Sequence, residues 1–256
     1  MSERPVLKLY SFGPGANSLK PMLALYEKGL DFTIHRLDPT KFEHHEDWFK
    51  VINPRGQVPA LEHDGKIITE STVICEYLED VFPDANPLRP KDPYDVAQMR
   101  VWTKWVDEYF CWCVSTIGWE RHIGPMARAY SDEDFEEYVA RIPVPEQQTK
   151  WRNARKGFPK ELLEDELRKI GVSVKRLEDQ LSRTEWLIGD QYTLADVCNY
   201  AIAGGMQFGF PEFVNAKDTP HLLAWIEKIA ARPAARKMYT EVPSEFARPQ
   251  ADAAKA

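Results

Sequence analysis

Four prolines between residues 83 and 93, in the stretch PDANPLRPKDP, divide the chain into two parts whose hydrophobic patterns differ. Each proline fixes its own φ angle and disfavours helical backbone in the residue before it, so a helix cannot run through this stretch. We therefore predict a first domain at residues 1–83, a linker at 84–92 and a second domain at 93–256.

The first domain alternates between strand and helix patterns. Strand patterns occupy residues 6–12 and 31–38, and a hairpin at 58–70 turns at Asp64-Gly65. Helical patterns begin near Ser18, around Trp48 and Phe49, and again near Val73, where the pattern ends before Pro83. The predicted element order is βαβαββα, an α+β domain.

The second domain shows helical periodicity almost throughout. The helical segments are 94–119, 161–183, 193–208 and 220–240. Residues of about 121–160 have weaker periodicity and are interpreted as an insertion between helices, and the last residues, ARPQADAAKA, as a mobile tail. The sequence therefore predicts an all-α second domain.

Composition limits the environment and the partners. A net charge of −7 disfavours nucleic acid as a partner. No apolar run approaches the roughly 20 residues that span a bilayer, and the N-terminus lacks signal-peptide features, so we expect a cytoplasmic protein without membrane insertion.

The cysteines and histidines do not form a metal-binding pattern. Four cysteines, at positions 75, 111, 113 and 198, are expected to be inert buried thiols, and the spacing of Cys111 and Cys113 turns them apart on a helix. The adjacent His44 and His45 lack a third ligand at a useful spacing. We therefore predict no metal site.

Gln57-Val58-Pro59 stands at the entrance of the predicted hairpin. A proline at this position cannot donate a backbone hydrogen bond to the neighbouring strand. A cis Val58-Pro59 bond would explain its presence, because the N–H and C=O groups of Val58 would then point outward. An ordinary turn proline is the alternative.

Glu70 and Ser71 stand at the start of the helix that follows the hairpin. Unpaired N–H groups at a helix N-terminus attract a carboxylate, Ser71 adds a hydroxyl, and Glu70 suits an ammonium group. The pair suits a ligand that is zwitterionic at one end, with an ordinary helix cap as the alternative. Farther along the chain, Thr193-Leu194-Ala195-Asp196 is typical of a structural capping box.

This layout and these motifs resemble the cytosolic glutathione transferases, in which a thioredoxin-like domain precedes a helical domain. The resemblance implies glutathione as co-substrate, with Val58 and Pro59 facing its cysteinyl backbone and Glu70 and Ser71 its γ-glutamyl end. For the glycyl carboxylate we nominate Gln57 and, less directly, Lys41. Arg100 is a further basic group, for which a solvated or interface role is equally compatible.

The loop GPGANSLKP, residues 13–21, leads into the first predicted helix and is a candidate position for the glutathione thiol. Helix N-termini and hydrogen-bond donors lower the pKa of a thiol from its usual value near 8.5. We predict that Ser18 stabilises the glutathione thiolate with Asn17 beside it, while Ser18 as a helix cap is the compatible alternative. Tyr10 is interpreted as a packing residue.

An aromatic stripe marks the predicted helix at 94–119. Trp102, Trp105, Tyr109 and Trp112 fall on one face at 100° per residue, which suits an aromatic second substrate. Such stripes more often belong to a hydrophobic core.

This helix, together with PEQQTKWRNARKGFP at 145–159, resembles the glutathione-dependent β-aryl etherases of lignin-degrading sphingomonads, of the type acting on the β(S) enantiomer. The resemblance implies an enzyme whose glutathione thiolate attacks Cβ of an α-keto aryl ether and releases a phenol. A phenoxide can leave without a general acid, and the sequence names none. The resemblance also implies a homodimer. A general glutathione transferase (conjugation, dehalogenation or isomerisation) and a non-catalytic glutathione-binding module remain as alternatives.

Overall fold

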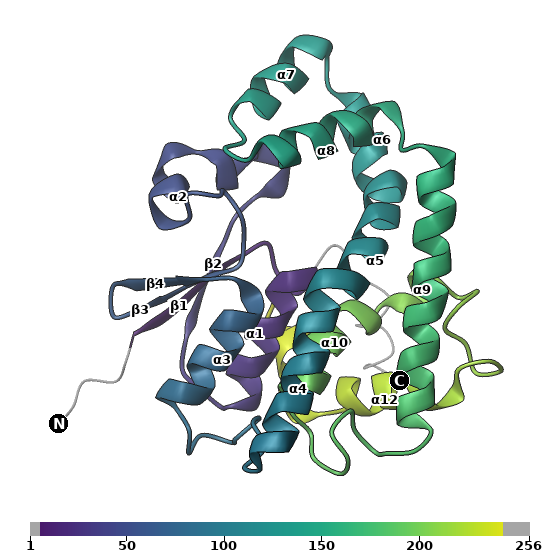
Figure 1. Cartoon of the computed structure of the whole chain (residues 1–256). Coiled ribbons are helices and arrows are strands. Elements are labelled where there is room, and N and C mark those ends of the chain that lie inside the picture. Colours follow the sequence, from purple (N-terminus) through teal and green to yellow (C-terminus); the bar gives the residue numbers. More distant parts are fainter. Residues whose placement is uncertain (1–5, 243–256) are drawn as a thin grey trace.

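In the computed structural model, which describes residues 6–242, the first part of the chain forms a four-stranded sheet with helices on both faces (Figure 1). The strand order is β2-β1-β3-β4, with β1 parallel to β2 and antiparallel to β3, and β3 antiparallel to β4. In chain order the elements are β1 (Leu7–Ser11), α1 (Ala16–Glu27), β2 (Thr33–Arg36), the 3₁₀ turns η1 (Pro39–Lys41) and η2 (Glu43–His45), α2 (Asp47–Ile52), β3 (Ala60–His63), β4 (Lys66–Thr69) and α3 (Ser71–Val81). The predicted order βαβαββα is confirmed.

Alternation along β1 assigns its side chains to the two faces of the sheet. Leu7 and Leu9 join the main hydrophobic core with residues of α1 and α3. Tyr10 faces the other side, in a smaller cluster with Phe49 of α2. Because successive side chains of a strand point to opposite faces, this short strand holds helices on both sides of the sheet.

The second part is helical, as predicted. In chain order its elements are α4 (Pro93–Trp105), η3 (Val106–Phe110), α5 (Cys111–Gly118), η4 (Trp119–Ile123), α6 (Gly124–Ala129), α7 (Asp132–Ala140), α8 (Pro145–Lys156), α9 (Lys160–Leu181), α10 (Leu194–Ala203), α11 (Met206–Gly209), α12 (Pro220–Ala230) and α13 (Pro233–Glu241). The helix predicted at 193–208 is divided into α10 and α11, and two further details differ from the expectation. The segments η3 and η4 are π-helical, and Arg232-Pro233 separates α12 from α13 within the single helix predicted at 220–240. Proline explains the second detail, since it starts a helix readily but cannot continue one.

The insertion predicted at about 121–160 folds into α6, α7 and α8, which lie beyond α5 and reach toward α2 (Figure 1). A separate hydrophobic cluster joins Phe135, Val139 and Trp151 of these helices to Phe42, which lies between η1 and η2. Tyr130 Oη also donates to the carbonyl of Thr40 at 3.1 Å. The insertion is therefore packed onto the first part of the chain.

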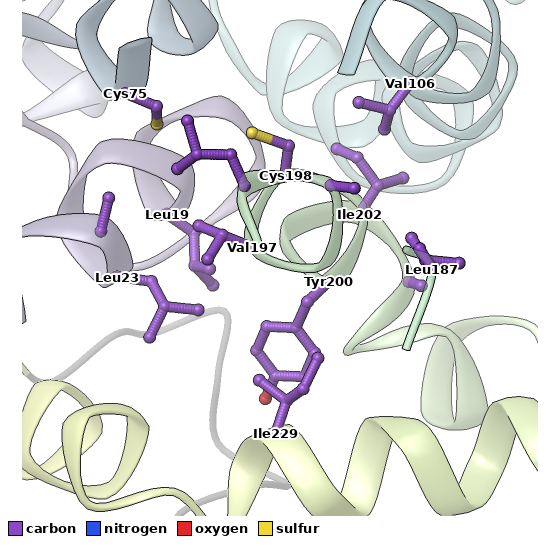
Figure 2. Close-up of a cluster of buried hydrophobic side chains, with 14 of the residues drawn as sticks. Leu19, Leu23, Cys75, Val106, Leu187, Val197, Cys198, Tyr200, Ile202 and Ile229 are labelled. Atoms are coloured by element: carbon purple, nitrogen blue, oxygen red, sulfur yellow. The ribbon is translucent and has the colours of Figure 1, made fainter. Parts of the chain in front are cut away.

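The main core continues from the sheet helices into the helical part without interruption. Figure 2 shows Leu19 and Leu23 of α1 and Cys75 of α3 beside Val197 and Cys198 of α10. All five side chains are at most 5 % exposed. Burial of this apolar surface fixes α1 against α10, so the start of α1 has a firm support.

His44 and His45 are buried where the insertion meets the first part of the chain, and their Nδ1 atoms have no hydrogen-bond partner. Burial, and then His45, lowers the pKa of His44 to about 3, and burial followed by Arg141 and Lys50 lowers the pKa of His45 to about 4. Both imidazoles are therefore neutral in the folded protein over most of the acidic range.

These depressed pKa values predict a loss of stability in mild acid. In the unfolded chain both histidines bind protons as the pH falls through 6.5, whereas the folded chain binds them only near pH 3–4, so acid favours unfolding by about 1.4 kcal/mol per pH unit for each histidine. Asp196, with a pKa raised by burial to about 6, opposes this with one proton. The expected net loss between pH 7 and pH 5 is about 2–3 kcal/mol. Urea titrations at several pH values measure it, and His44→Gln/His45→Gln should remove the loss; an unchanged slope in that variant would contradict the assignment.

Within residues 6–242 every helix is too short or too polar to cross a lipid bilayer. The predicted mobile C-terminal tail lies outside the described residues.

Candidate functional site

Val58-Pro59 lies beside the end of β1, next to the loop that leads into α1. The Val58-Pro59 bond is cis, as expected from the sequence. Tyr10 pairs with Ala60, and Val58 packs with Phe12 in one cluster. Neither backbone polar group of Val58 has a hydrogen-bond partner among the described residues, so both are available to a ligand running alongside as a strand.

The start of α1 contributes Asn17 and Ser18. Gly15 is the N-cap, with no side-chain cap, and Ala16 follows with a φ of 42°. Ser18 therefore lies in the first turn, and its alternative assignment as the N-cap is wrong. Asn17 is exposed, while Ser18 keeps 4 % of its surface and its hydroxyl has no hydrogen-bond partner within residues 6–242. The first turn thus presents uncapped N–H groups, a hydroxyl and an amide.

The start of α3 contributes Glu70 and Ser71. Glu70 is the N-cap residue but its side chain caps nothing, and its φ is 67°. It is exposed, whereas Ser71 is buried at the first helical position. A positive φ is costly for glutamate, and such strain concentrates at functional sites.

A partly buried ion pair joins these two helix starts: the Lys20 side chain is enclosed, while that of Asp107 is 36 % exposed. Lys20 Nζ pairs with Asp107 Oδ1 and also donates to Asn17 Oδ1 at 2.8 Å, while Thr72 Oγ1 donates to Asp107 Oδ2. The Lys20 side chain is completely buried, and Asp107 belongs to the π-helical segment η3. Asp107 therefore ties α1 and α3 to the helical part of the chain.

This ion pair also orients the amide of Asn17. An ammonium group only donates hydrogen bonds, so the Asn17 oxygen must face Lys20. The thiol of Cys111 donates to the same oxygen at 3.6 Å. The amide nitrogen of Asn17 is left to donate to an anion at the start of α1.

Sequence reasoning missed Lys20, Asp107 and Cys111. Lys20 interrupts an otherwise apolar run from Leu19 to Leu25, and a lysine in such a run is a signal of a buried partner. Cys111 is half-buried, not one of the fully buried thiols that the sequence suggested. Burial raises the pKa of the Cys111 thiol more than Lys20 lowers it, so it acts here as a neutral donor.

The four predicted aromatic residues divide into two groups. The Trp102 ring meets that of Trp105 edge-on at 5.5 Å, Trp105 stacks on Tyr109 at 6.5 Å, and the Arg176 guanidinium lies over both indoles. Among residues 6–242 no ring contact joins Trp112 to these three; it is 56 % exposed and lies near Lys150. The reason is η3, because a π-helical turn between Trp105 and Cys111 breaks the 100° spacing on which the single wall was predicted.

The two residues nominated for the glycyl end, Gln57 and Lys41, both have side-chain partners within the protein. Gln57 accepts from Arg55 at 3.2 Å, and its backbone carbonyl is held by Asn53 at 2.7 Å. Lys41 is 72 % exposed and pairs with Asp38 at 3.4 Å.

Two further groups are explained by internal contacts. Arg100 pairs with Glu76, and Tyr10 donates to Glu62 at 2.8 Å, which supports the interpretation of Tyr10 as a packing residue. Among residues 6–242 there is no group of three His, Cys, Asp or Glu side chains that could hold a metal ion.

The site can therefore hold an extended ligand whose one end is zwitterionic and whose middle carries an anion. Val58 offers backbone pairing, the start of α3 suits a carboxylate, Glu70 suits an ammonium, and the start of α1 with Asn17 and Ser18 suits a thiolate.

Comparisons with known proteins agree with this geometry. The family model "Glutathione S-transferase, N-terminal domain" matches residues 5–80 of the chain, and the family model "Glutathione S-transferase, C-terminal domain" matches residues 110–233. Protein LigF of a Sphingobium species is 63 % identical over 238 residues, which cover 91 % of this chain and 93 % of that protein. The crystal structure of Beta-etherase LigF superposes with a TM-score of 0.90 at 62 % identity, over 92 % of this chain and 99 % of that one. Glutathione transferase F7 from Populus trichocarpa superposes with a TM-score of 0.72 at 27 % identity, over 91 % and 98 % of the two chains.

Proposed function

The chain belongs to the glutathione S-transferase family, and we propose that within this family it cleaves β-aryl ether bonds with glutathione as co-substrate. The observation that carries this proposal is the 63 % identity to LigF across 91 % of the chain, a relative whose crystal structure is that of a β-etherase. The uncapped start of α1, beside an amide oriented by Lys20, supplies the thiolate site that this chemistry requires.

The proposed reaction is a displacement at Cβ of a lignin-type dimer whose α-carbon is a ketone. The ketone makes Cβ electrophilic, the glutathione sulfur forms a bond to it, and the electron pair of the Cβ–O bond leaves with the aryl oxygen. In-line attack inverts the stereocentre and yields a phenol and a β-glutathionyl ketone. The protein contributes an ionised sulfur, alignment of the two substrates and exclusion of water. Selectivity for the β(S) enantiomer is part of the proposal.

Each part of glutathione has a proposed partner in the first domain, residues 1–83. Val58 and Pro59 pair with its cysteinyl backbone, and Ser71 with the α3 N-terminus binds the γ-glutamyl carboxylate beside Glu70. Gln57 and Lys41 are nominated for the glycyl carboxylate. Support comes from the cis bond and unpartnered backbone of Val58 and from the uncapped start of α3.

The aromatic substrate is assigned to the second domain, residues 93–256. Exposed Trp112 directly follows Cys111, which contacts Asn17, so this indole is favoured as the aromatic contact. Trp105 and Tyr109 are retained as half-buried neighbours, and Trp102, at 8 % exposed, as their support. We also propose that two copies of the chain pair, which light scattering would reveal as twice the 29.6 kDa of one chain.

One assay separates the proposed function from its alternatives. A racemic α-keto β-O-4 dimer carrying a fluorescent phenol is incubated with glutathione and the protein. We expect release of half the dye, which indicates a stereoselective etherase. No dye but activity on a halonitrobenzene would indicate a general transferase, and glutathione binding without either activity would indicate a binding module.

Variants at the start of α1 test where the sulfur is ionised. Ser18→Ala and Asn17→Ala should each raise the pKa of bound glutathione by about 1–2 units, because a hydrogen bond to a charged group contributes about 1.5–3 kcal/mol. Ether cleavage at neutral pH should fall by about ten-fold or more, as the thiolate fraction falls. Ultraviolet titration of the bound thiolate measures the pKa, with Ser182→Ala at the end of α9 as control. An unchanged thiol pKa in both variants excludes this assignment.

A further inference from the structure

Lys150 on α8 is a half-buried cation without a carboxylate partner among residues 6–242. Its Nζ lies 4.4 Å from the centre of the Trp119 ring and 5.4 Å from that of Trp112, and it donates to Ser115 Oγ at 3.1 Å. The neighbouring cations of α8 are arranged differently, because Arg152 pairs with Glu136 at 2.8 Å and Arg155 with Asp132 at 2.6 Å.

Two features make this ammonium group a strong proton donor. It has three N–H bonds, of which Ser115 accepts one, and the indole faces offer only weak acceptance to the others. Burial lowers its pKa to about 8, although the nearby Cys111 acts in the opposite direction. The group is therefore still charged at neutral pH but releases its proton more readily than an ordinary lysine.

Helix α5 contacts both Lys150 and the proposed thiolate site. Cys111 at the start of α5 contacts Asn17, and Ser115, which contacts Lys150, lies four residues later on the same helix. Four residues, about 6 Å along the helix axis, separate the two contact points on α5. Figure 1 shows the insertion helices beyond α5, on the side away from α4.

In an in-line displacement the attacking sulfur and the departing oxygen lie on opposite sides of one carbon, so the groups that serve them stand at two separate points along the substrate. With the sulfur at Asn17, the departing oxygen of a substrate lying along α5 points toward Ser115 and Lys150. Trp112 lies between Cys111 and Ser115 in the chain and is exposed to meet the aryl ring.

We propose that Lys150 is a catalytic residue that donates a proton to the aryl oxygen as the Cβ–O bond breaks. The sulfur electron pair forms the S–Cβ bond, the Cβ–O pair moves to the oxygen, and the ammonium proton joins it to give a neutral phenol. The neutral amine then regains a proton from water. A phenol has a pKa near 10, so this transfer is favourable. The inference rests on the proposed etherase function and adds the acid that the sequence alone did not identify.

The test compares Lys150→Met with the unaltered protein on α-keto ethers of phenols that differ in acidity. Methionine keeps the apolar stem over the indoles but cannot donate a proton. We expect kcat for the ether of unsubstituted phenol to fall about 10²–10³-fold, the usual contribution of a general acid. The ether of 4-nitrophenol, whose anion leaves readily, should lose less than about five-fold.

Lys156→Met, at the exposed end of the same helix, is the matched control and should behave as the unaltered protein with every phenol. An equal loss in Lys150→Met for all phenols would overturn the inference, because a structural defect does not depend on the leaving group. The proposed etherase function is tested by the activity of the unaltered protein on these ethers, whereas the role of Lys150 is tested only by the difference between the phenols in Lys150→Met. The pKa of the bound glutathione thiol should be the same in Lys150→Met as in the unaltered protein. A shifted thiol pKa would overturn the inference, because it would mean that Lys150 acts on the sulfur and not on the departing oxygen.

Discussion

Asp107→Leu is expected to lower the free energy of unfolding by about 3 kcal/mol, because it leaves the buried ammonium of Lys20 without its counter-ion. The Lys20 side chain has no exposed surface, and its other partner, Asn17, is neutral. Leucine cannot accept from the ammonium, but position 107 is 36 % exposed, so water replaces part of the lost interaction and the loss stays at the low end for a broken ion pair. Thr72 loses its acceptor at the same time.

The double variant Lys20→Met/Asp107→Leu separates the energetic role of this pair from its role at the site. Exchange of both charges for apolar groups of similar size is often neutral for stability, so most of the loss should be recovered. The pKa of bound glutathione should nevertheless be raised in the double variant, because no ammonium then orients the Asn17 amide. Urea denaturation and thiol titration measure the two effects. Recovery of a normal thiol pKa along with stability would show that Lys20 has no part in orienting Asn17.

The elements of the first domain could be predicted because their signals are local. The alternation in β1, the Asp64-Gly65 turn and the Val58-Pro59 dipeptide each act within a few residues, and each appears in the structure where expected. The same holds for the Thr193 and Asp196 capping box at the start of α10, which the structure confirms.

The parts that could not be predicted depend on contacts between distant segments. The helices of the insertion bury Phe135 and Trp151 against Phe42, which precedes them in the chain by 93 and 109 positions. The Lys20 and Asp107 pair likewise joins α1 to η3. A π-helical turn has no dependable local signal either, and its presence shifted Trp112 out of the predicted aromatic wall.

Asp196→Asn is expected to destabilise the protein by about 3–4 kcal/mol, although it changes one atom type. Asp196 is completely buried, and its Oδ1 accepts from the Leu187 N–H and from Trp225 Nε1, both at 3.0 Å. Its Oδ2 accepts from the N–H of Thr193 at 3.0 Å and more weakly from its hydroxyl at 3.4 Å. An asparagine offers one oxygen, so donors on the other side face an NH₂ group, and each buried donor left unpaired costs about 1–3 kcal/mol. Urea denaturation measures this loss, with exposed Asp190→Asn in the preceding loop as the matched control.

The thiol of bound glutathione distinguishes Asp196→Asn from the double variant Lys20→Met/Asp107→Leu. Asp196 holds the start of α10 to α12 and to the loop that precedes α10, whereas Val197 and Cys198 of α10 pack with α1 in the main core (Figure 2). In the folded fraction of Asp196→Asn the start of α1 is therefore unchanged, and the thiol pKa should equal that of the unaltered protein. A raised thiol pKa in Asp196→Asn would mean that the capping box also controls the geometry at Asn17, and that the Lys20 pair is not its local determinant.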